Sequence, residues 1–303
     1  MARRMKVGVQ LPEVERYVTW PEVREMAVTA EAVGFDSLWV GDHLLYRSGN
    51  ETTGPWEAWS ILAAIAAVTE RVQIGPLVAA TSFHNPAMLA KKAATVDEIS
   101  NGRLILGLGA GWNRVEYDAY GFPFDHRASR FEEAFTIIQT LLSDGAIDFV
   151  GEYYTLRDCE LVPPARPGGI PLMIGSEGPR VLRATLPHVN MWNSWFAWFG
   201  NTPEGAAESI AMMEATCREA GRDPSEVEKT VTVLVCAPGG SSDPQGSPDN
   251  RKAYPVGGTH EGIAKVLAAF AEVGVDRVQL VVDPITTASI EWLGGVLAMM
   301  DDR

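Results

Sequence analysis

The feature that most constrains this fold is a regular alternation of short β-rich runs with longer stretches of helical spacing. The expected strands cover residues 5–11, 37–40, 72–78, 104–108, 171–174, 189–192, 229–236 and 277–282. The expected helices cover residues 21–33, 56–69, 86–100, 129–142, 179–186, 203–220, 261–273 and 286–300. Eight βα units without a low-complexity linker favour a closed parallel barrel over a doubly wound sheet. We therefore predict an α/β fold, a TIM-like (β/α)8 barrel that forms one domain over residues 1–303.

Two segments stand outside this alternation and predict insertions in the loops at the C-terminal face of the barrel. Residues 151–156 are expected to form a short β segment. Residues 238–258 are rich in Gly, Pro, Ser and Asp and lie between a predicted strand and the next helix. Loops of this length are usually lids or disordered surface segments, and the sequence leaves both interpretations open.

The charge and the apolar runs limit the partners of this chain. With 39 acidic and 25 basic residues, it has a net charge of −14 and lacks the positive field that holds a phosphate backbone. Its longest aliphatic run, 61–68, is much shorter than the roughly 20 residues of a membrane span. The three cysteines are widely spaced, and no metal-ligand motif such as HExxH occurs. We predict a cytoplasmic protein that binds a small molecule, without a metal and without nucleic acid or membrane as partner.

In a parallel barrel, the residues just after each strand form the active site, which selects a short list of candidates. Asp42 and His43 follow the second strand, and a histidine beside a carboxylate is suited to proton transfer near neutral pH. The turn after the fifth strand offers backbone amides at a helix start, which either bind an anion or form an ordinary turn. The aromatic run 191–199 is either core packing, a subunit contact, or a wall for a flat apolar ligand.

An ordered series of motifs resembles the luciferase-like monooxygenase superfamily, and most closely its branch that uses coenzyme F-420, an 8-hydroxy-5-deazaflavin. These motifs are AEAVGFDSLWVGDH at 30–43, IGPLV at 74–78, HNP at 84–86, the run from 93 to 112 that ends in LGLGAGW, and PLMIGSEGP at 171–179. The resemblance extends over nearly the whole chain and implies the same barrel fold. It also implies a non-prolyl cis peptide between Leu77 and Val78, which would bulge against the back face of the cofactor ring.

Carried over position by position, the resemblance implies a cofactor site and a catalytic residue. The implied cofactor-binding residues are Asp42, Leu77, Val78, Gly109, Ala110, Asn113, Gly175, Ser176, Gly178, Pro179 and Asn193, with residues 175–179 at the cofactor phosphate. His43 is the expected catalytic residue, and Trp195 and Trp198 are expected to contact the substrate. Two positions depart from the family pattern. Ala110 replaces the acidic proton donor of members that oxidise a sugar phosphate, and Glu177 stands in the phosphate turn where a small residue is usual.

The resemblance implies an oxidoreductase that transfers a hydride between coenzyme F-420 and an apolar or aromatic small molecule, with His43 assisting the proton transfer. An FMN-dependent monooxygenase on the same fold is the first alternative, because both cofactors carry a tricyclic ring and a phosphate. A cofactor-binding barrel without fast chemistry is the second. The alanine-rich helices 56–69 and 86–100 permit close packing, and we expect a homodimer through this region.

Overall fold

The computed structural model describes residues 3–243, 245 and 251–301 and forms a barrel of parallel strands. Around the barrel the strands follow the order β5 (Gln73–Pro76), β2 (Ser37–Val40), β1 (Lys6–Gln10), β13 (Arg277–Asp283), β12 (Glu228–Cys236), β11 (Met191–Ser194), β10 (Leu172–Gly175), β7 (Leu106–Gly109) and β6 (Ala79–Ala80). Because β6 continues β5 and pairs with β7, and Ile74 bridges Leu104, the barrel closes with eight strand positions. The predicted fold class is confirmed.

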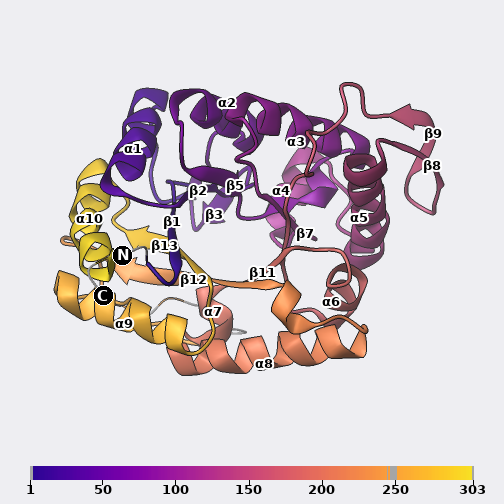
Figure 1. Ribbon diagram of the computed structural model, residues 1–303. Coiled ribbons are helices and arrows are strands. Elements are labelled where there is room, and N and C mark those ends of the chain that lie inside the picture. The colour runs from indigo at the N-terminus through magenta and orange to yellow at the C-terminus, as the bar shows by residue number, and fades with distance from the viewer. Residues whose placement is uncertain (1–2, 244, 246–250, 302–303) are drawn as a thin grey trace.

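An outer ring of helices covers the barrel (Figure 1). It consists of α1 (Trp20–Val33), α2 (Ala58–Val68), α3 (Pro86–Ser100), α5 (Arg127–Asp144), α6 (Pro179–Thr185), α8 (Pro203–Glu219), α9 (His260–Glu272) and α10 (Thr287–Asp301). Outward-facing strand residues such as Val7 and Val9 pack against these helices in the main core, because successive side chains of a strand point to opposite faces. Among the described residues, no helix is long and apolar enough to cross a membrane.

Two helices begin two residues away from their predicted starts, for local reasons, and the other helix starts agree to within one residue. Helix α2 begins at Ala58 instead of residue 56, because the Glu57 carboxylate accepts hydrogen bonds from the amides of Trp59 and Ser60 and caps the helix. Helix α5 begins two residues earlier than predicted, at Arg127, after His126 in a left-handed conformation. Both changes lie at the ends of helices, where local hydrogen bonds decide the boundary.

The insertions are more regular than predicted. The short β segment expected at residues 151–156 is present as a hairpin with other bounds. Strands β8 (Ala146–Val150) and β9 (Thr155–Glu160) pair antiparallel outside the barrel, and residues 151–154 form their turn. The Glu133 carboxylate accepts hydrogen bonds from the amides of Glu152, Tyr153 and Tyr154, which holds this turn against α5. A second hairpin, β3 (Tyr46–Ser48) and β4 (Glu51–Thr53), follows β2 and has no counterpart in the predicted elements.

The strand predicted at 72–78 is interrupted, since β5 ends at Pro76 and β6 begins at Ala79. The peptide bond between Leu77 and Val78 is cis, as the resemblance implies. Hydrogen bonds secure both sides of the interruption to β2 and the loop after it. The Leu77 amide donates to the Val40 carbonyl at 2.9 Å, and the Ala80 amide donates to Asp42 Oδ2 at 2.9 Å.

At the opposite, N-terminal end of the barrel, the Arg277 side chain is 1% exposed and joins several strands. Its guanidinium donates to Glu228 of β12 at 2.8 Å, to Ser37 of β2 at 3.2 Å and to Gln73 of β5 at 2.8 Å. The hydrogen-bonded Arg277 side chain therefore closes the N-terminal end of the barrel to ligands.

The long segment predicted at 238–258 is anchored at both ends. The Ala237 amide donates to the Asp283 carbonyl at 2.8 Å, and the Cys236 amide donates to the Val256 carbonyl at 2.9 Å. The buried Asn201 amide group donates to the carbonyls of Leu234 and Tyr254, so it fastens the returning segment to β12. Residues 244 and 246–250 lie outside the described residues, and the choice between a lid and a surface segment therefore stays open.

Candidate functional site

Asp42 and His43 both lie at the C-terminal end of β2, but their side chains serve different partners. Asp42 is 4% exposed, and its Oδ2 accepts hydrogen bonds from the Ala80 amide at 2.9 Å and pairs with His84 Nε2 at 2.9 Å. The Asp42 carboxylate thus turns to His84 and not to its sequence neighbour His43. Asp42 secures the loop after β6, and it influences His43 through its charge alone.

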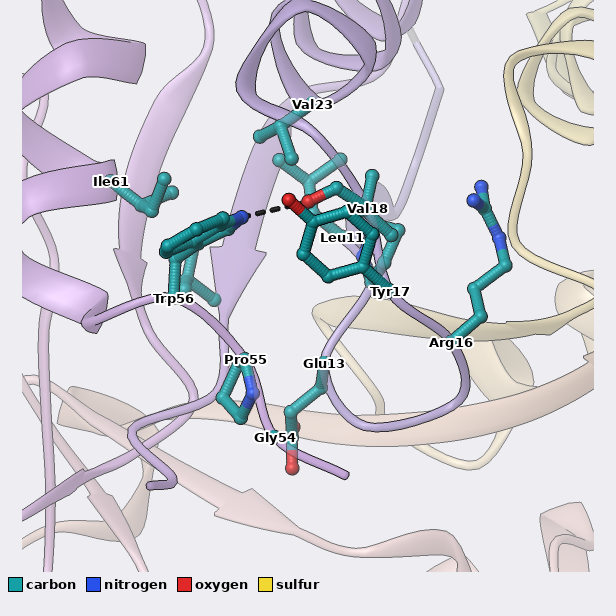
Figure 2. Close-up of a pocket in the computed structure, with 12 residues that line it drawn as sticks. Leu11, Glu13, Arg16, Tyr17, Val18, Val23, Gly54, Pro55, Trp56 and Ile61 are labelled. Atoms are coloured by element: carbon teal, nitrogen blue, oxygen red, sulfur yellow. Dashed lines mark hydrogen bonds between the residues drawn. The ribbon is translucent and has the colours of Figure 1, made fainter. Parts of the chain in front are cut away.

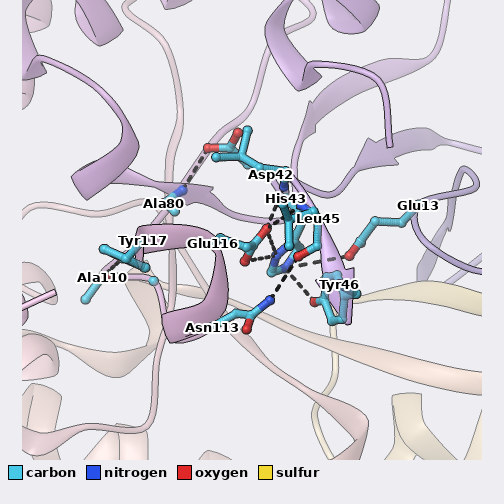
Figure 3. A network of polar contacts seen from close by, with 12 residues as sticks. Glu13, Asp42, His43, Leu45, Tyr46, Ala80, Ala110, Asn113, Glu116 and Tyr117 are labelled. Atoms are coloured by element: carbon cyan, nitrogen blue, oxygen red, sulfur yellow. Dashed lines mark hydrogen bonds and ion pairs between the residues drawn. The ribbon is translucent and has the colours of Figure 1, made fainter. Parts of the chain in front are cut away.

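The imidazole of His43 lies between two other carboxyl groups (Figure 3). Its Nδ1 is 2.9 Å from Glu116 Oε2, and its Nε2 is 3.6 Å from Glu13 Oε1. The Tyr46 hydroxyl is 3.1 Å from the same Nε2. Both ring nitrogens therefore face groups that stabilise a protonated imidazole, and the ring has a fixed orientation.

Glu116 positions this network from α4 (Arg114–Tyr120), a short helix beyond β7. Its side chain is fully buried, and its Oε1 accepts the amides of Leu44 at 2.5 Å and Leu45 at 3.3 Å. Burial alone would raise the pKa of Glu116, but the hydrogen bond and charge of His43 and the two amides outweigh it and lower this pKa. Glu116 is therefore an ionised anchor that holds both the loop after β2 and the histidine.

The pKa values of Glu13 and His43 are both raised, whereas that of Glu116 is lowered. Burial raises the pKa of Glu13 to about 7, although the positive charge of His43 opposes this shift. Burial lowers the pKa of His43, but the charges of Glu13, Glu116 and Asp42 and the hydrogen bond to Glu116 outweigh it, so this pKa is raised. A carboxyl group that exchanges its proton near neutral pH thus lies beside an imidazole whose protonated form is stabilised.

The backbone at Gly41 makes room for Glu13. A Cβ atom at residue 41 would lie 2.0 Å from Glu13 Oε2 and 2.4 Å from its Cδ, so the Glu13 side chain crosses directly over this glycine. Gln10 at the end of β1 donates through Nε2 to Glu13 Oε2 at 2.8 Å and fixes the carboxyl group there. A glycine after β2 is thus a packing requirement of the proton network.

Val78, beside the cis peptide, rests on a group of glycines at the mouth of the barrel. Cβ atoms at Gly107, Gly109 and Gly175 would lie 2.9, 2.7 and 2.9 Å from its side-chain methyl groups. These glycines belong to β7 and β10, and Val78 itself is half-buried. Leu77 packs beneath it in a small cluster inside the barrel. The result is an apolar surface formed by Val78 over the glycines of β7 and β10.

The predicted residues beyond β7 and β11 hold the loops of the site together. Asn113 donates through Nδ2 to the Leu45 carbonyl at 3.3 Å, and the Ala110 carbonyl accepts the hydroxyl of Tyr117 at 3.1 Å. Asn193 is buried on β11, and its Oδ1 accepts the hydroxyl of Thr230 at 2.8 Å. Their predicted contacts with a cofactor stay predictions.

The turn predicted to receive a phosphate lies between β10 and α6. Gly175 ends the strand, the Gly178 amide donates to Ser176 Oγ at 3.0 Å, and Pro179 begins the helix. The carboxylate of Glu177, which departs from the family pattern, accepts the hydroxyls of Ser194 at 2.8 Å and Ser209 at 2.9 Å. The Glu177 side chain is thereby fixed to Ser194 of β11 and Ser209 of α8.

The predicted substrate residues lie on and beside α7 (Phe196–Phe199), a short helix that replaces part of the expected aromatic loop. Trp195 is half-buried, packs against the cluster inside the barrel and lies 4.7 Å from the Phe196 ring. Trp198 is half-buried on the helix itself, and its amide donates to the Trp195 carbonyl at 2.8 Å. Trp195 is thus near the barrel interior, and both substrate contacts stay predictions.

Four residues of the site were missed by the sequence reasoning. Glu13 lies two residues beyond the strand predicted at 5–11, so the rule of strand ends could have found it. Glu116 and Tyr46 belong to a helix and a hairpin that were not predicted, and Glu116 meets a histidine 73 positions away. Trp112 is 62% exposed, and its ring lies edge-on to His43 and Tyr46 at 5.9 and 6.0 Å. It forms the outer wall of the proton network.

Unsatisfied polar atoms inside the barrel suit a ligand with hydrogen-bonding groups. Gln10 Oε1 and both polar atoms of the Gln279 side chain are buried and have no hydrogen-bond partner among the described residues. Buried polar atoms are usually paired, so a bound molecule or water would be expected to satisfy them. Together with the apolar surface of Val78, they fit a planar ring with a polar edge. Within the described residues, no group of three or more His, Cys, Asp and Glu side chains is arranged to hold a metal ion.

The closed parallel barrel, with a cis peptide and a histidine held by carboxyl groups at its C-terminal mouth, places this chain among the (β/α)8-barrel proteins. The family model for luciferase-like monooxygenases matches residues 5–243, and the chain belongs to this family. The predicted resemblance to this family is confirmed.

Individual relatives differ in the activity that their names state. An F-420-dependent glucose-6-phosphate dehydrogenase of Amycolatopsis mediterranei is 39% identical over 52% of this chain and 48% of its own length. A 5,10-methylenetetrahydromethanopterin reductase of Archaeoglobus fulgidus is 32% identical over 59% and 49%, and a pyrimidine monooxygenase RutA of Cronobacter sakazakii is 34% identical over 55% and 50%. The chain thus spans about half the length of these curated relatives.

Solved structures agree with the fold over almost the whole chain. An F-420-dependent secondary alcohol dehydrogenase in complex with an F-420-acetone adduct has a TM-score of 0.83 at 22% identity and covers 98% of this chain and 99% of its own. The EDTA monooxygenase EmoA from a Chelativorans species has a TM-score of 0.79 at 15% identity, with coverages of 99% and 94%. At these identities the likeness shows a common fold.

Proposed function

We propose that this protein is an oxidoreductase that transfers a hydride between coenzyme F-420 and an apolar or aromatic small molecule. The observation that carries this proposal is the His43 imidazole, which lies between Glu116 and Glu13 at the mouth of the barrel. The Val78 surface belongs to the same mouth, because hydrogen bonds join β2 and its loop to both sides of the cis peptide. The names of F-420-dependent relatives support the choice of cofactor.

The residues present fit the deazaflavin. Val78 would contact the ring face, Gln10 and Gln279 would satisfy its polar edge, and Gly175, Ser176, Gly178 and Pro179 would hold its phosphate. When bound, the reduced cofactor supplies a carbon-bound hydride for an electron-poor double bond, imine, carbonyl or nitroarene. Asp42, Leu77, Gly109, Ala110, Asn113 and Asn193 complete the proposed cofactor site.

The chain's own residues would manage the proton that accompanies the hydride. His43 Nε2 donates the proton to the substrate atom that becomes negative, or accepts it in the reverse direction. Glu116 stays ionised at Nδ1 and stabilises the imidazolium. Glu13, whose pKa of about 7 lets it gain and lose a proton near neutrality, can restore the proton to the histidine.

An FMN-dependent monooxygenase is the second candidate, because RutA proteins and EmoA are also similar to this chain. A side-by-side titration of the purified protein with coenzyme F-420 and FMN, followed by tryptophan fluorescence, separates the two. Tighter binding of F-420 is the expected result. Preference for FMN would replace the proposal with the monooxygenase, and binding of neither would leave a barrel without this chemistry.

His43→Ala tests the catalytic role. We expect turnover with F-420 to fall by about 10²- to 10⁴-fold, the usual contribution of a positioned acid or base. The dissociation constant for F-420 should change little, because His43 faces the proton network. Unchanged turnover would exclude a proton role for His43.

Trp195 and Trp198 remain the proposed substrate contacts, and a homodimer through α2 and α3 remains the proposed assembly.

A further inference from the structure

A cavity of about 120 Å³ adjoins the proton network, with Glu13 among the residues that line it (Figure 2). It lies between the loop after β1 and the segment that leads into α2. Its walls are largely aliphatic: Leu11, Val18, Val23 and Val40 are each between 2% and 7% exposed, and Ile61 of α2 completes them. These side chains come from different elements of the fold and enclose an apolar space.

Two large aromatic rings form the rim of this cavity. Tyr17 is 73% exposed and Trp56 is 50% exposed, and their centroids lie 6.0 Å apart in an edge-on arrangement. The indole Nε1 of Trp56 donates to the Val18 carbonyl at 2.7 Å, which holds the ring against the loop after β1. The rim is therefore formed in the protein alone and exposes aromatic surface that a ligand would cover.

The charges around the cavity disfavour an anion. Arg16 is the one cation among the described residues that line it, and its guanidinium pairs with Glu22 at 2.5 Å and donates to the Ile285 carbonyl at 3.2 Å. Glu13 is the acidic side chain among the described residues that line the cavity. A phosphate or carboxylate would thus meet a cation that is already paired and a carboxyl group that repels it.

Glu13 connects the cavity to the chemistry. The same side chain lines the cavity and places its Oε1 3.6 Å from His43 Nε2. A group bound in the cavity would therefore be separated from His43 by a single residue of the proton network, Glu13. The cavity uses different elements from Trp195 and Trp198, so it is a separate binding region.

We propose that this cavity binds the neutral, apolar end of the substrate, a single ring or a short branched alkyl group, and that it excludes anionic substrates. Its size agrees with this class, since an aliphatic-lined cavity of about 150 Å³ in another protein binds benzene. The identity of this group as part of the substrate rests on the proposed function. Binding in the cavity itself requires no cofactor.

The test measures binding of benzyl alcohol and of benzoate to the cofactor-free protein by ligand-observed NMR. The two probes share a ring and differ in charge. We expect benzyl alcohol to bind at least tenfold more tightly than benzoate. Ile61→Trp should fill the cavity and weaken benzyl alcohol by at least tenfold, whereas Ile99→Trp, the same change at a position of α3 that is 45% exposed, should leave its affinity unchanged. Equal binding of both probes, or equal binding to both variants, would overturn the proposal.

A measurement on the native protein keeps the test valid if Ile61→Trp fails to fold. The indole N–H resonance of Trp56, assigned by its loss in Trp56→Phe, should shift on addition of benzyl alcohol, and an unshifted resonance would contradict binding at the rim. Titration with F-420 runs in parallel. If F-420 fails to bind while benzyl alcohol occupies the cavity, the proposed function falls and the cavity site stands. If F-420 binds and benzyl alcohol does not, the cavity proposal falls alone.

Discussion

His43 depends on Glu116 for its charge as well as its orientation. Glu116→Gln keeps an oxygen for the amides of Leu44 and Leu45 but removes the negative charge at Nδ1. Because that charge helps to raise the pKa of His43, we expect the variant to lower this pKa. Titration of the imidazole by NMR measures it directly, with Glu25→Gln on the exposed face of α1 as the control. An unchanged pKa would show that Glu116 acts only as a loop anchor.

Glu13 makes the protein less stable as the pH rises. Its pKa is raised from about 4.5 to about 7 on folding, so between these values the unfolded chain loses a proton that the native protein retains. Glu13→Gln removes this cost. We expect the variant to unfold with a free energy about 1–3 kcal/mol higher than the native protein at pH 8, and with almost no difference at pH 4.5. Chemical denaturation at the two pH values gives both numbers, and an equal difference at both would contradict the shift.

At the scale of elements, the glycines beneath Val78 make a packing prediction. A Cβ atom at Gly109 would lie 2.7 Å from a Val78 methyl group, whereas one at Gly178 would meet only Ser176 Oγ, at 3.4 Å. We expect Gly109→Ala to destabilise the protein by about 1–3 kcal/mol through overpacking, and Gly178→Ala to have a small effect. Thermal unfolding compares them. Val78→Ala should restore stability in the Gly109→Ala background, and failure of this rescue would place the strain elsewhere.

The elements also show how far the sequence could predict this structure. The strand rule located Asp42, His43 and Gly109 at one end of the barrel, because all βα loops of a parallel barrel meet there. It could not assign partners, since the two neighbours Asp42 and His43 turn to different loops. The β3–β4 hairpin and α4 were not predicted, because they are short and are held by tertiary contacts such as those of Glu116. The cavity could not be predicted, because the residues that line it come from separate segments of the sequence.

At the scale of the whole molecule, substitution of Arg277 tests how much its hydrogen bonds across the barrel contribute to stability. Arg277→Met would leave its partners on β12, β2 and β5 without their donor. We expect a loss of about 2–4 kcal/mol, because removal of one partner leaves buried polar groups unpaired. Arg4→Met, which removes an exposed pair with Glu272, should cost about 0–1 kcal/mol. Denaturant unfolding measures both.

Binding of F-420 to Arg277→Met is the companion measurement. Arg277 lies at the N-terminal end of the barrel, and the proposed cofactor site lies at the opposite end. We therefore expect the dissociation constant to stay within about twofold of the native value at a temperature where the variant is folded. A large loss of affinity would mean that the two ends of the barrel are coupled.

The Asn201 side chain has a consequence for how such proteins diversify. It ties the segment that returns at Tyr254 to β12, while Ala237 is bonded to Asp283 where the segment departs. Both attachment points rest on strands of the barrel, and the stretch between them also packs on it, since Ala253 is fully buried and the Arg251 amide donates to the Ala197 carbonyl at 3.0 Å. A loop of different length or composition therefore has to keep Asn201, Ala237, Arg251 and Ala253, and natural variation that recruits new ligands meets the same limit.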